Sequence, residues 1–164
     1  MTSAFSTRGA PSQSGASLIE VMISVLVMAI GLLGVAAMQA TALRNSQSSL
    51  ERSQAVISTY TMLDAMRANR DAALAGTYNT AGYLCATNGN GSLAALDQAQ
   101  WVKGWRATLG VDGTADQAAC GSINCNGGVC EIGLRWDDSR ATNAGNGQLA
   151  QGSATQTFLT KVQL

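Results

Sequence analysis

An uncharged apolar segment near the N-terminus most constrains the fold of this chain. No residue from Val21 to Leu43 is charged, and its polar interruptions are Ser24, Gln39 and Thr41. As a helix rising about 1.5 Å per residue, this segment reaches roughly 34 Å, which is enough to cross a hydrocarbon core of about 30 Å. A core helix of a soluble protein would show a polar face, and this segment shows none. The segment therefore predicts a single membrane-spanning helix.

The residues around the segment bear on its orientation. Residues 1–15 hold one basic residue, Arg8, and no acid, which favours a cytoplasmic N-terminus, although Arg44 and Arg52 follow the segment. An ordinary secretory signal peptide is an alternative, because residues 40–42 (ATA) fit a small-x-small cleavage site. The apolar run is too long for a typical signal peptide, so we expect the helix to be retained and the rest of the chain to be exported.

A short motif precedes the apolar segment. The string GASLIEV, residues 15–21, resembles the processing site of type IV pilins and pseudopilins. In that family a prepilin peptidase cuts after the glycine and methylates the new N-terminus. The resemblance implies a cut between Gly15 and Ala16, removal of the leader 1–15, and methylation of Ala16. The chain departs from the commonest pattern in having Ala rather than Phe at the first mature position.

Glu20 is an acidic residue at the edge of the apolar segment. A carboxylate at the centre of a bilayer helix costs about 2.5–3.5 kcal/mol, and less near an edge. Such acids usually have a partner, and the family resemblance implies that the partner of Glu20 is the α-amino group of Ala16 of a neighbouring subunit. The alternative is a carboxylate that reaches the membrane interface without a partner.

Apolar residues also recur beyond the uncharged segment. Leu43, Leu50 and Ile57 lie seven residues apart, and polar residues fill most positions between them. This pattern predicts an amphipathic helix that buries one stripe. The same stripe has further apolar residues nearby, at Tyr60, Leu63 and Met66.

Nothing in the sequence interrupts this helix. Because the only proline is Pro11, we expect one helix from about Ser17 to about Leu74, with Gly31 and Gly34 as its only weak points. Its expected parts are a membrane-spanning half, 16–43, and an amphipathic upper half, 44–76.

The end of this helix extends the resemblance. The string MRANR, residues 66–70, followed by an Ala-rich stretch and Gly76, resembles minor pilins of the PilV type. Arg67 and Arg70 lie three residues apart. They either contact a neighbouring subunit or place favourable cations near the helix C-terminus.

The remainder, 77–164, is expected to form a globular head. Ser92 can cap a helix that runs to about Leu109 and stops at Gly110. On this helix Trp101, Trp105 and Leu109 share one stripe, which we expect to be buried in the core rather than exposed for a ligand.

Two later segments alternate with a period of two. In CEIGLRWD (130–137) and TFLTKVQL (157–164), alternate residues are apolar, which predicts two half-buried strands. We also expect a third strand before Cys130. The long connection over 137–154 is predicted to be a surface or recognition loop, with Asp137 and Asp138 as turn formers because no calcium-binding spacing surrounds them. The predicted fold is therefore α+β and pilin-like, with a long N-terminal helix packed on a small antiparallel sheet.

Four cysteines lie in the head. Cys120, Cys125 and Cys130 are each separated by four residues, which is not the usual C-x-x-C spacing of zinc ribbons and redox sites. In an exported domain, two disulfides among these three and Cys85 are expected, in any of three connectivities. No metal site is expected, although a site of four thiolates is the alternative.

Composition excludes several classes of function. The chain has no histidine, so it lacks the commonest general base and metal ligand, and its 10 basic and 10 acidic residues leave no basic face for nucleic acid. We therefore expect neither an enzyme nor a cofactor.

The resemblance implies a minor pilin in type IV pilus assembly and priming, anchored in the inner membrane with the head in the periplasm and later carried into an extracellular pilus. Its implied partners are the prepilin peptidase, other minor pilins and major pilin subunits. A minor pseudopilin of a type II secretion system and a pilus-tip adhesin remain alternatives.

Overall fold

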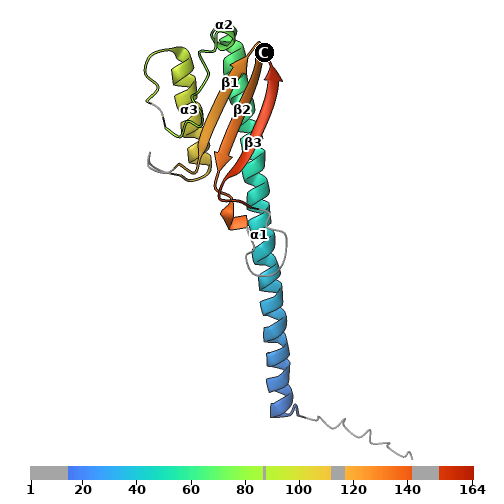
Figure 1. Cartoon of the computed structure of the whole chain (residues 1–164). Helices are drawn as coiled ribbons and strands as arrows, with labels where there is room; N and C mark the ends of the chain where they lie inside the picture. The colour runs from blue at the N-terminus through green and yellow to red at the C-terminus, as the bar shows by residue number, and fades with distance from the viewer. Residues whose placement is uncertain (1–14, 87, 112–116, 142–151) are drawn as a thin grey trace, which may run out of the picture. The chain divides into compact units, whose positions relative to one another are not determined.

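The computed structural model describes residues 15–86, 88–111, 117–141 and 152–164 (Figure 1). The chain divides into two compact units, Met1–Ala40 and Thr41–Leu164. Helix α1 begins in the first unit and ends in the second. In chain order the helices and strands are α1 (Leu18–Ala68), α2 (Arg70–Leu74), α3 (Leu93–Thr108), β1 (Cys120–Asn126), β2 (Val129–Trp136), the 3₁₀ helix η1 (Ser139–Ala141) and β3 (Gln156–Gln163).

The first unit, as far as it is described, is the 18–40 part of α1. All its side chains are exposed, and the helix runs without interruption through Gly31 and Gly34. Among the described residues α1 is the one helix long and apolar enough to cross a membrane, with a mean hydropathy of 2.6 over its most apolar window and none of that window buried.

The second unit is the globular head, which the 41–68 part of α1 shares with a three-stranded antiparallel sheet. The strand order is β1-β2-β3, so neighbours in the sequence are neighbours in the sheet. The long helix packs against the sheet, as the sequence predicts, and the expected third strand before Cys130 is β1. On β2 the predicted alternation is confirmed, because four residues of one face are buried: Cys130, Ile132, Leu134 and Trp136.

A two-glycine turn joins β1 to β2. Gly127 and Gly128 have φ of 59° and 82°, a left-handed conformation that side-chain-bearing residues adopt at a cost. Two consecutive positive φ values are typical of the type I′ turn, whose twist matches that of the strands it joins. The sequence GG thus fixes the register in which Cys125 faces Cys130.

Helix α3 matches the prediction closely. The Ser92 hydroxyl accepts a hydrogen bond from the Ala95 N–H at 3.2 Å, which caps the first turn. Trp101 and Trp105 are both buried in the core, as expected from their shared stripe. Trp105 meets Trp136 of β2 edge to face, with ring centroids 5.5 Å apart and planes at 82°.

Trp101 connects three elements of the head. Its indole N–H donates to the Ser58 carbonyl of α1 at 2.9 Å. Its ring covers Gly121 of β1 so closely that a Cβ on Gly121 would lie 2.3 Å from a ring carbon. Only glycine permits this approach of the strand to α3 and α1.

The predicted stripe on the upper part of α1 is wrong for its first three members. Leu43, Leu50 and Ile57 are exposed by 67%, 59% and 57%, and the neighbouring Tyr60 by 55%, although Leu63 and Met66 are buried. A heptad spacing drifts by about 20° per repeat around a straight helix of 3.6 residues per turn. The face that meets the head instead follows spacings of three and four, through Ala55, Thr59, Met62, Leu63 and Met66.

The expected end of α1 near Leu74 is also corrected. The helix ends at Ala68, and Asn69, with φ −120° and ψ 51°, separates it from α2. Asparagine is a poor helix former because its side chain competes for local hydrogen bonds. Here the Asn69 amide donates to the Tyr78 hydroxyl at 3.2 Å, a contact nine residues away that favours the break.

The close approach at Gly121 gives a direct stability test. We expect Gly121→Ala to destabilise the head by about 1–3 kcal/mol, because the new methyl group would overlap the Trp101 ring. Gly104→Ala in α3 is the matched control: its Cβ would meet nothing within 4 Å, and the helix should gain up to about 1 kcal/mol. Urea unfolding of the full chain in detergent, followed by tryptophan fluorescence, measures both. Equal stabilities of the two variants would contradict the packing.

Candidate processing and assembly segment

The predicted processing site lies just before α1. Gly15, Ala16 and Ser17 are exposed and precede the first helical residue, Leu18. A Cβ on Gly15 would meet nothing within 4 Å, so this part of the described backbone is unobstructed. Residues 1–14, which include Arg8 and Pro11, lie outside the described residues.

Glu20 occupies the first turn of α1. Its N–H donates to the Ser17 carbonyl at 3.0 Å, the first hydrogen bond of the helix. A carboxylate in this position is favoured by the positive end of the helix dipole. Within the described residues no ion pair involves Glu20. The carboxylate is therefore placed at the helix start, but nothing in the described chain neutralises it.

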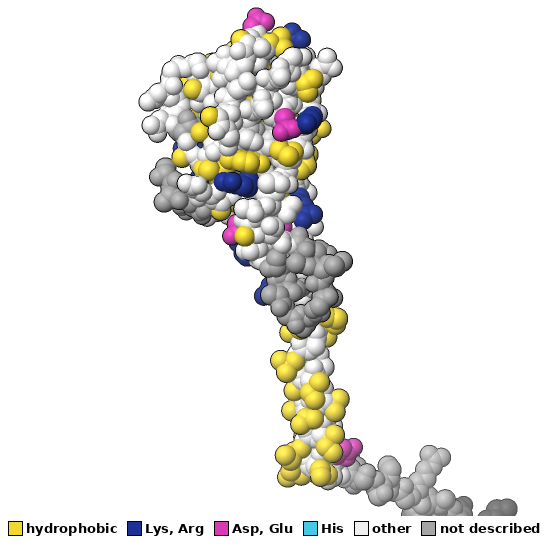
Figure 2. All heavy atoms as spheres, viewed as in Figure 1, with side chains coloured by type: hydrophobic (Ala, Val, Ile, Leu, Met, Phe, Trp, Pro, Cys, Tyr) yellow, Lys and Arg dark blue, Asp and Glu magenta, His cyan; other side chains and the backbone are white. Residues whose placement is uncertain are grey.

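Ser24, the polar residue one turn further, is satisfied locally. Its hydroxyl donates to the Glu20 carbonyl at 2.7 Å, a common way for serine to remain in an apolar helix. Figure 2 shows hydrophobic side chains gathered on the visible face of the 18–40 part of α1. These side chains cover no other described part of the chain, so they need lipid or other helices around them.

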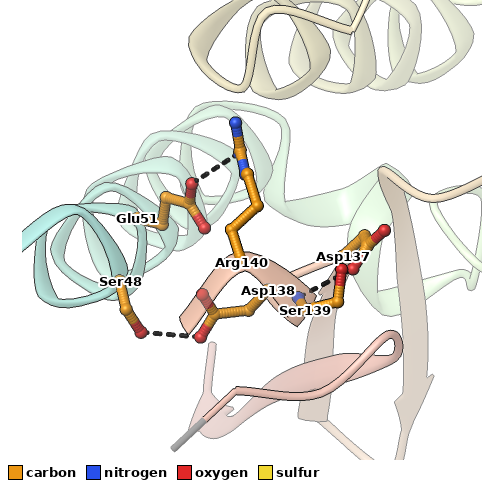
Figure 3. Close-up of polar contacts among 6 residues, drawn as sticks. All are labelled: Ser48, Glu51, Asp137, Asp138, Ser139 and Arg140. Carbon is orange, nitrogen blue, oxygen red and sulfur yellow. Dashed lines mark hydrogen bonds and ion pairs between the residues drawn. The ribbon is translucent and has the colours of Figure 1, made fainter. Parts of the chain in front are cut away.

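The head contributes a polar cluster that fastens α1 to the segment after β2. The Ser48 hydroxyl donates to Asp138 Oδ2 at 2.6 Å, and Arg140 Nη2 lies 3.0 Å from Glu51 Oε1. In Figure 3 Ser48 and Asp138 point toward one another, and Arg140 reaches across to Glu51. We call these four residues the α1 clasp.

The α1 clasp holds a nearly buried acid. Asp138 is only 2% exposed, and its N–H donates to the Ser153 carbonyl at 2.8 Å, so the two ends of the β2–β3 connection are joined there. The prediction that Asp138 is a turn former is therefore wrong, because its side chain instead bonds to Ser48 of α1. Asp137 does form a turn, because its Oδ1 accepts from the Ser139 N–H at 2.8 Å.

Glu51 is the member of the α1 clasp whose pKa departs from its ordinary value. Burial raises the pKa of Glu51 above its ordinary value of 4.5, against the opposing effect of Arg140, and the Asp138 charge raises it further. Its Oε2 atom and the Trp136 indole N–H are buried and lack a hydrogen-bond partner of good geometry. The indole dipole nevertheless favours the ionised carboxylate. Sequence reasoning missed this cluster because its residues lie about ninety positions apart.

Two disulfides stabilise the head. Cys85 pairs with Cys120, and Cys125 pairs with Cys130, one of the three connectivities that the sequence left open. The second bridge joins residues directly opposite each other on β1 and β2. The first fastens the connection after α2 to the start of β1, where the buried Arg106 donates to the Cys85 carbonyl at 3.1 Å. Among all the described residues, no group of three or more His, Cys, Asp or Glu side chains could hold a metal ion.

The two arginines on either side of the break, Arg67 in α1 and Arg70 in α2, have partners within the chain. Arg67 lies 3.3 Å from Asp64 Oδ1, an exposed pair one turn apart worth a few tenths of a kcal/mol. Arg70 donates to the Leu164 carbonyl at 3.1 Å, which ties α2 to the end of the chain. The break at Asn69 places these residues on different helices, so they do not share one helical face.

Comparison with known proteins identifies the N-terminal segment. Residues 11–36 match the family model described as the prokaryotic N-terminal methylation motif. Neither curated proteins nor solved structures gave a match to the chain. The motif indicates a type IV pilin-like or pseudopilin protein, and the long helix packed on a small three-stranded sheet is a pilin-like arrangement. The motif also implies processing by a prepilin peptidase, assembly with other pilins and membrane anchoring.

The raised pKa of Glu51 predicts a pH effect on stability. The folded chain holds the Glu51 proton more tightly than the unfolded chain, so stability increases as pH falls through the raised pKa and levels off below 4.5. Glu51→Gln removes this contribution. We therefore expect the free energy of unfolding of the variant, relative to that of the parent, to decrease as pH falls from 7. Thermal unfolding across pH measures the difference.

The control for this test is Glu131→Gln. Glu131 forms an exposed pair with Lys161 at 3.0 Å on the sheet surface. Because an exposed ion pair contributes at most about 1 kcal/mol, this variant should have nearly the stability of the parent. A pH-independent difference for Glu51→Gln would contradict the desolvation of Glu51.

Proposed function

We propose that this chain is a minor pilin that takes part in assembling and priming a type IV pilus. The observation that carries the proposal is the methylation motif over residues 11–36 joined to an apolar helix whose 18–40 part is exposed among the described residues. Such a helix has two stable surroundings, lipid before assembly and other apolar helices after it. The role is structural, and no turnover of a substrate is involved.

The proposed processing uses the residues before α1. A prepilin peptidase cuts after Gly15 and methylates the amine of Ala16. Glu20, one turn into the helix, then pairs with the Ala16 amine of a neighbouring subunit. Because both groups are poorly solvated at the membrane, their pairing favours one register between adjacent helices.

The proposal keeps the segment boundaries predicted from the sequence. The proposed leader is 1–15 and the membrane-spanning half of the helix is 16–43. The segment 44–76, which holds the upper part of α1 and α2, and the segment 77–164 together build the head. We infer that the N-terminus is cytoplasmic and the head periplasmic until the subunit enters an extracellular pilus. Two disulfides in the head support an oxidising compartment.

The upper half of α1 supports contact with further subunits. Leu43, Leu50 and Ile57 are exposed in the head. Exposed apolar residues at this spacing are suited to pack against another helix. Partners of this surface are other minor pilins and major pilin subunits.

The string MRANR, residues 66–70, supports a minor pilin of the PilV type over a type II pseudopilin. Deletion in the source bacterium separates the two, because loss of surface pili with normal protein secretion is expected for a pilin. Lost secretion with normal pili would assign the chain to the secretion system. Lost adhesion with normal pili would favour a tip adhesin.

Intact mass spectrometry tests the processing step. In protein extracted from its native membrane we expect loss of residues 1–15 and addition of one methyl group to Ala16. A Gly15→Val variant should keep the leader, because the peptidase recognises the glycine. Parent protein that keeps residues 1–15 in the native membrane would contradict the proposal.

Glu20→Leu tests the assembly step. The variant should enter the membrane as well as the parent or better, because an apolar residue replaces a charge that costs up to about 3 kcal/mol. It should be processed but incorporated poorly into sheared pili, as measured by immunoblotting of the membrane and pilus fractions. Ser24→Ala, which removes only a local hydrogen bond, is the control and should assemble normally. Normal incorporation of the Glu20→Leu variant would remove the proposed role of the charge.

A further inference from the structure

Strand β3 forms an edge of the sheet that no described strand covers. It pairs with β2 in an unbroken register from Gln156 to Gln163. Natural sheet edges are usually shortened, bent by bulges, interrupted by proline or covered by another segment. Apart from the cation of Lys161, β3 has none of these protections. The edge is therefore regular and eight residues long.

The opposite edge of the sheet is closed. Gly121 of β1 exchanges two backbone hydrogen bonds with Leu84, at 2.6 and 2.9 Å. Further along, the Thr80 N–H donates to the Ile123 carbonyl at 2.8 Å, and the Asn79 side chain bonds both backbone groups of Cys125. The segment after α2 thus satisfies the outer edge of β1.

These contacts fix the direction of the backbone groups across the sheet. In an antiparallel sheet, successive residues direct their N–H and C=O groups alternately to the two sides of the strand. The backbone N–H and C=O groups of Gly121 and Ile123 are directed away from β2. Those of Ser122 are therefore directed toward β2, at Gly133. The backbone N–H and C=O groups of Ile132, the neighbour of Gly133 on β2, are then directed toward β3.

The alternation continues onto β3. Ile132 faces Thr160, so the even-numbered residues of β3 bond to β2. The odd-numbered residues direct their N–H and C=O groups outward, and no described residue bonds to them. These outward residues are Thr157, Leu159, Lys161 and Gln163.

Both sides of this edge offer apolar contacts. Toward α1, a groove of about 320 Å³ is lined by Val56, Trp136 and Phe158, among others. On the opposite face of the sheet, Leu159 is 55% exposed at the centre of the strand. An added strand, whose side chains alternate between the two faces, would meet an apolar neighbour on each side.

We propose that the outer edge of β3 binds an extended segment of a different polypeptide in the same assembly by β-strand addition. A row of backbone donors and acceptors at every second residue is complementary to an extended backbone. The groove beside α1 favours an apolar side chain on the inner face of the incoming segment. This inference rests on the proposed function for the assembly, but its test is independent of processing.

A second copy of this chain fits the edge less well in an antiparallel pairing. In a twofold antiparallel pairing of β3 with β3, the two strands would run in opposite directions. Because the 41–68 part of α1 runs alongside β3 in the head (Figure 1), the two helices would also run in opposite directions. Two subunits anchored in one membrane with the same orientation would not adopt that arrangement.

Amide hydrogen exchange of the full chain tests the open edge first. In purified protein in detergent, the amides of Thr157, Leu159 and Lys161 should exchange fast, whereas those of Phe158, Thr160 and Val162 should be protected. In native membrane or pilus material, the outward amides should slow by about 100-fold or more. Unchanged fast exchange in the assembled state would overturn the proposal, as would protection in the isolated chain.

A pair of variants at Leu159 separates backbone pairing from side-chain contact. Leu159→Pro removes the outward N–H while leaving the bonds of β3 to β2, whereas Leu159→Ala keeps the N–H and removes the side chain. We expect Leu159→Pro to reduce incorporation about tenfold or more, and Leu159→Ala to reduce it at most about threefold. Equal losses would overturn backbone pairing. If Leu159→Pro unfolds the head, the exchange experiment on the parent protein still decides.

A photo-crosslinking residue at Thr157 identifies the occupant. An adduct with a different polypeptide, mapped to one segment whose amides are also protected, supports the proposal. An adduct with twice the mass of the chain would identify a second copy and overturn it. Intact mass of the same material shows whether the leader has been removed, so failure of the edge inference is distinguishable from failure of the proposed function.

Discussion

Helix α1 makes two different demands on its surroundings, and the organisation of the chain follows from them. Over 18–40 its side chains are exposed among the described residues. Leaving a Leu, Ile, Val or Met side chain in water costs about 1.5–3 kcal/mol relative to full burial. From Ala55 to Met66 the same helix provides part of the head core. One continuous backbone thus links a segment that needs an apolar solvent to a domain that folds in water.

The head is built around the face of α1 that it buries. Three tryptophans from α3 and β2 meet that helix and the sheet, and Gly121 lets Trp101 approach the strand. The α1 clasp adds a polar connection lower on the helix, where Asp138 and Arg140 reach Ser48 and Glu51. The Cys85–Cys120 disulfide and the segment after α2 close one side of the sheet, which leaves β3 as the open side among the described strands.

Periodicity in the sequence predicted those elements whose contacts are local or repeat regularly. The capped helix at Ser92, the buried stripe of Trp101 and Trp105, and the alternation on β2 are confirmed. The heptad of Leu43, Leu50 and Ile57 misled, because a repeat shows that a face is apolar but not which partner covers it. The break at Asn69 depends on Tyr78, a contact that no local pattern announces.

By itself the sequence determined the processing motif, the long apolar helix, the α+β class and the need for two disulfides. Each of these depends on residue type and spacing along one stretch of chain. The tertiary structure alone decided the connectivity of the cysteines, the buried face of α1, the role of Asp138 and the direction of the free backbone groups on β3. Those features depend on which distant segments are adjacent in space, and adjacency is set by packing of the whole head rather than by any local pattern.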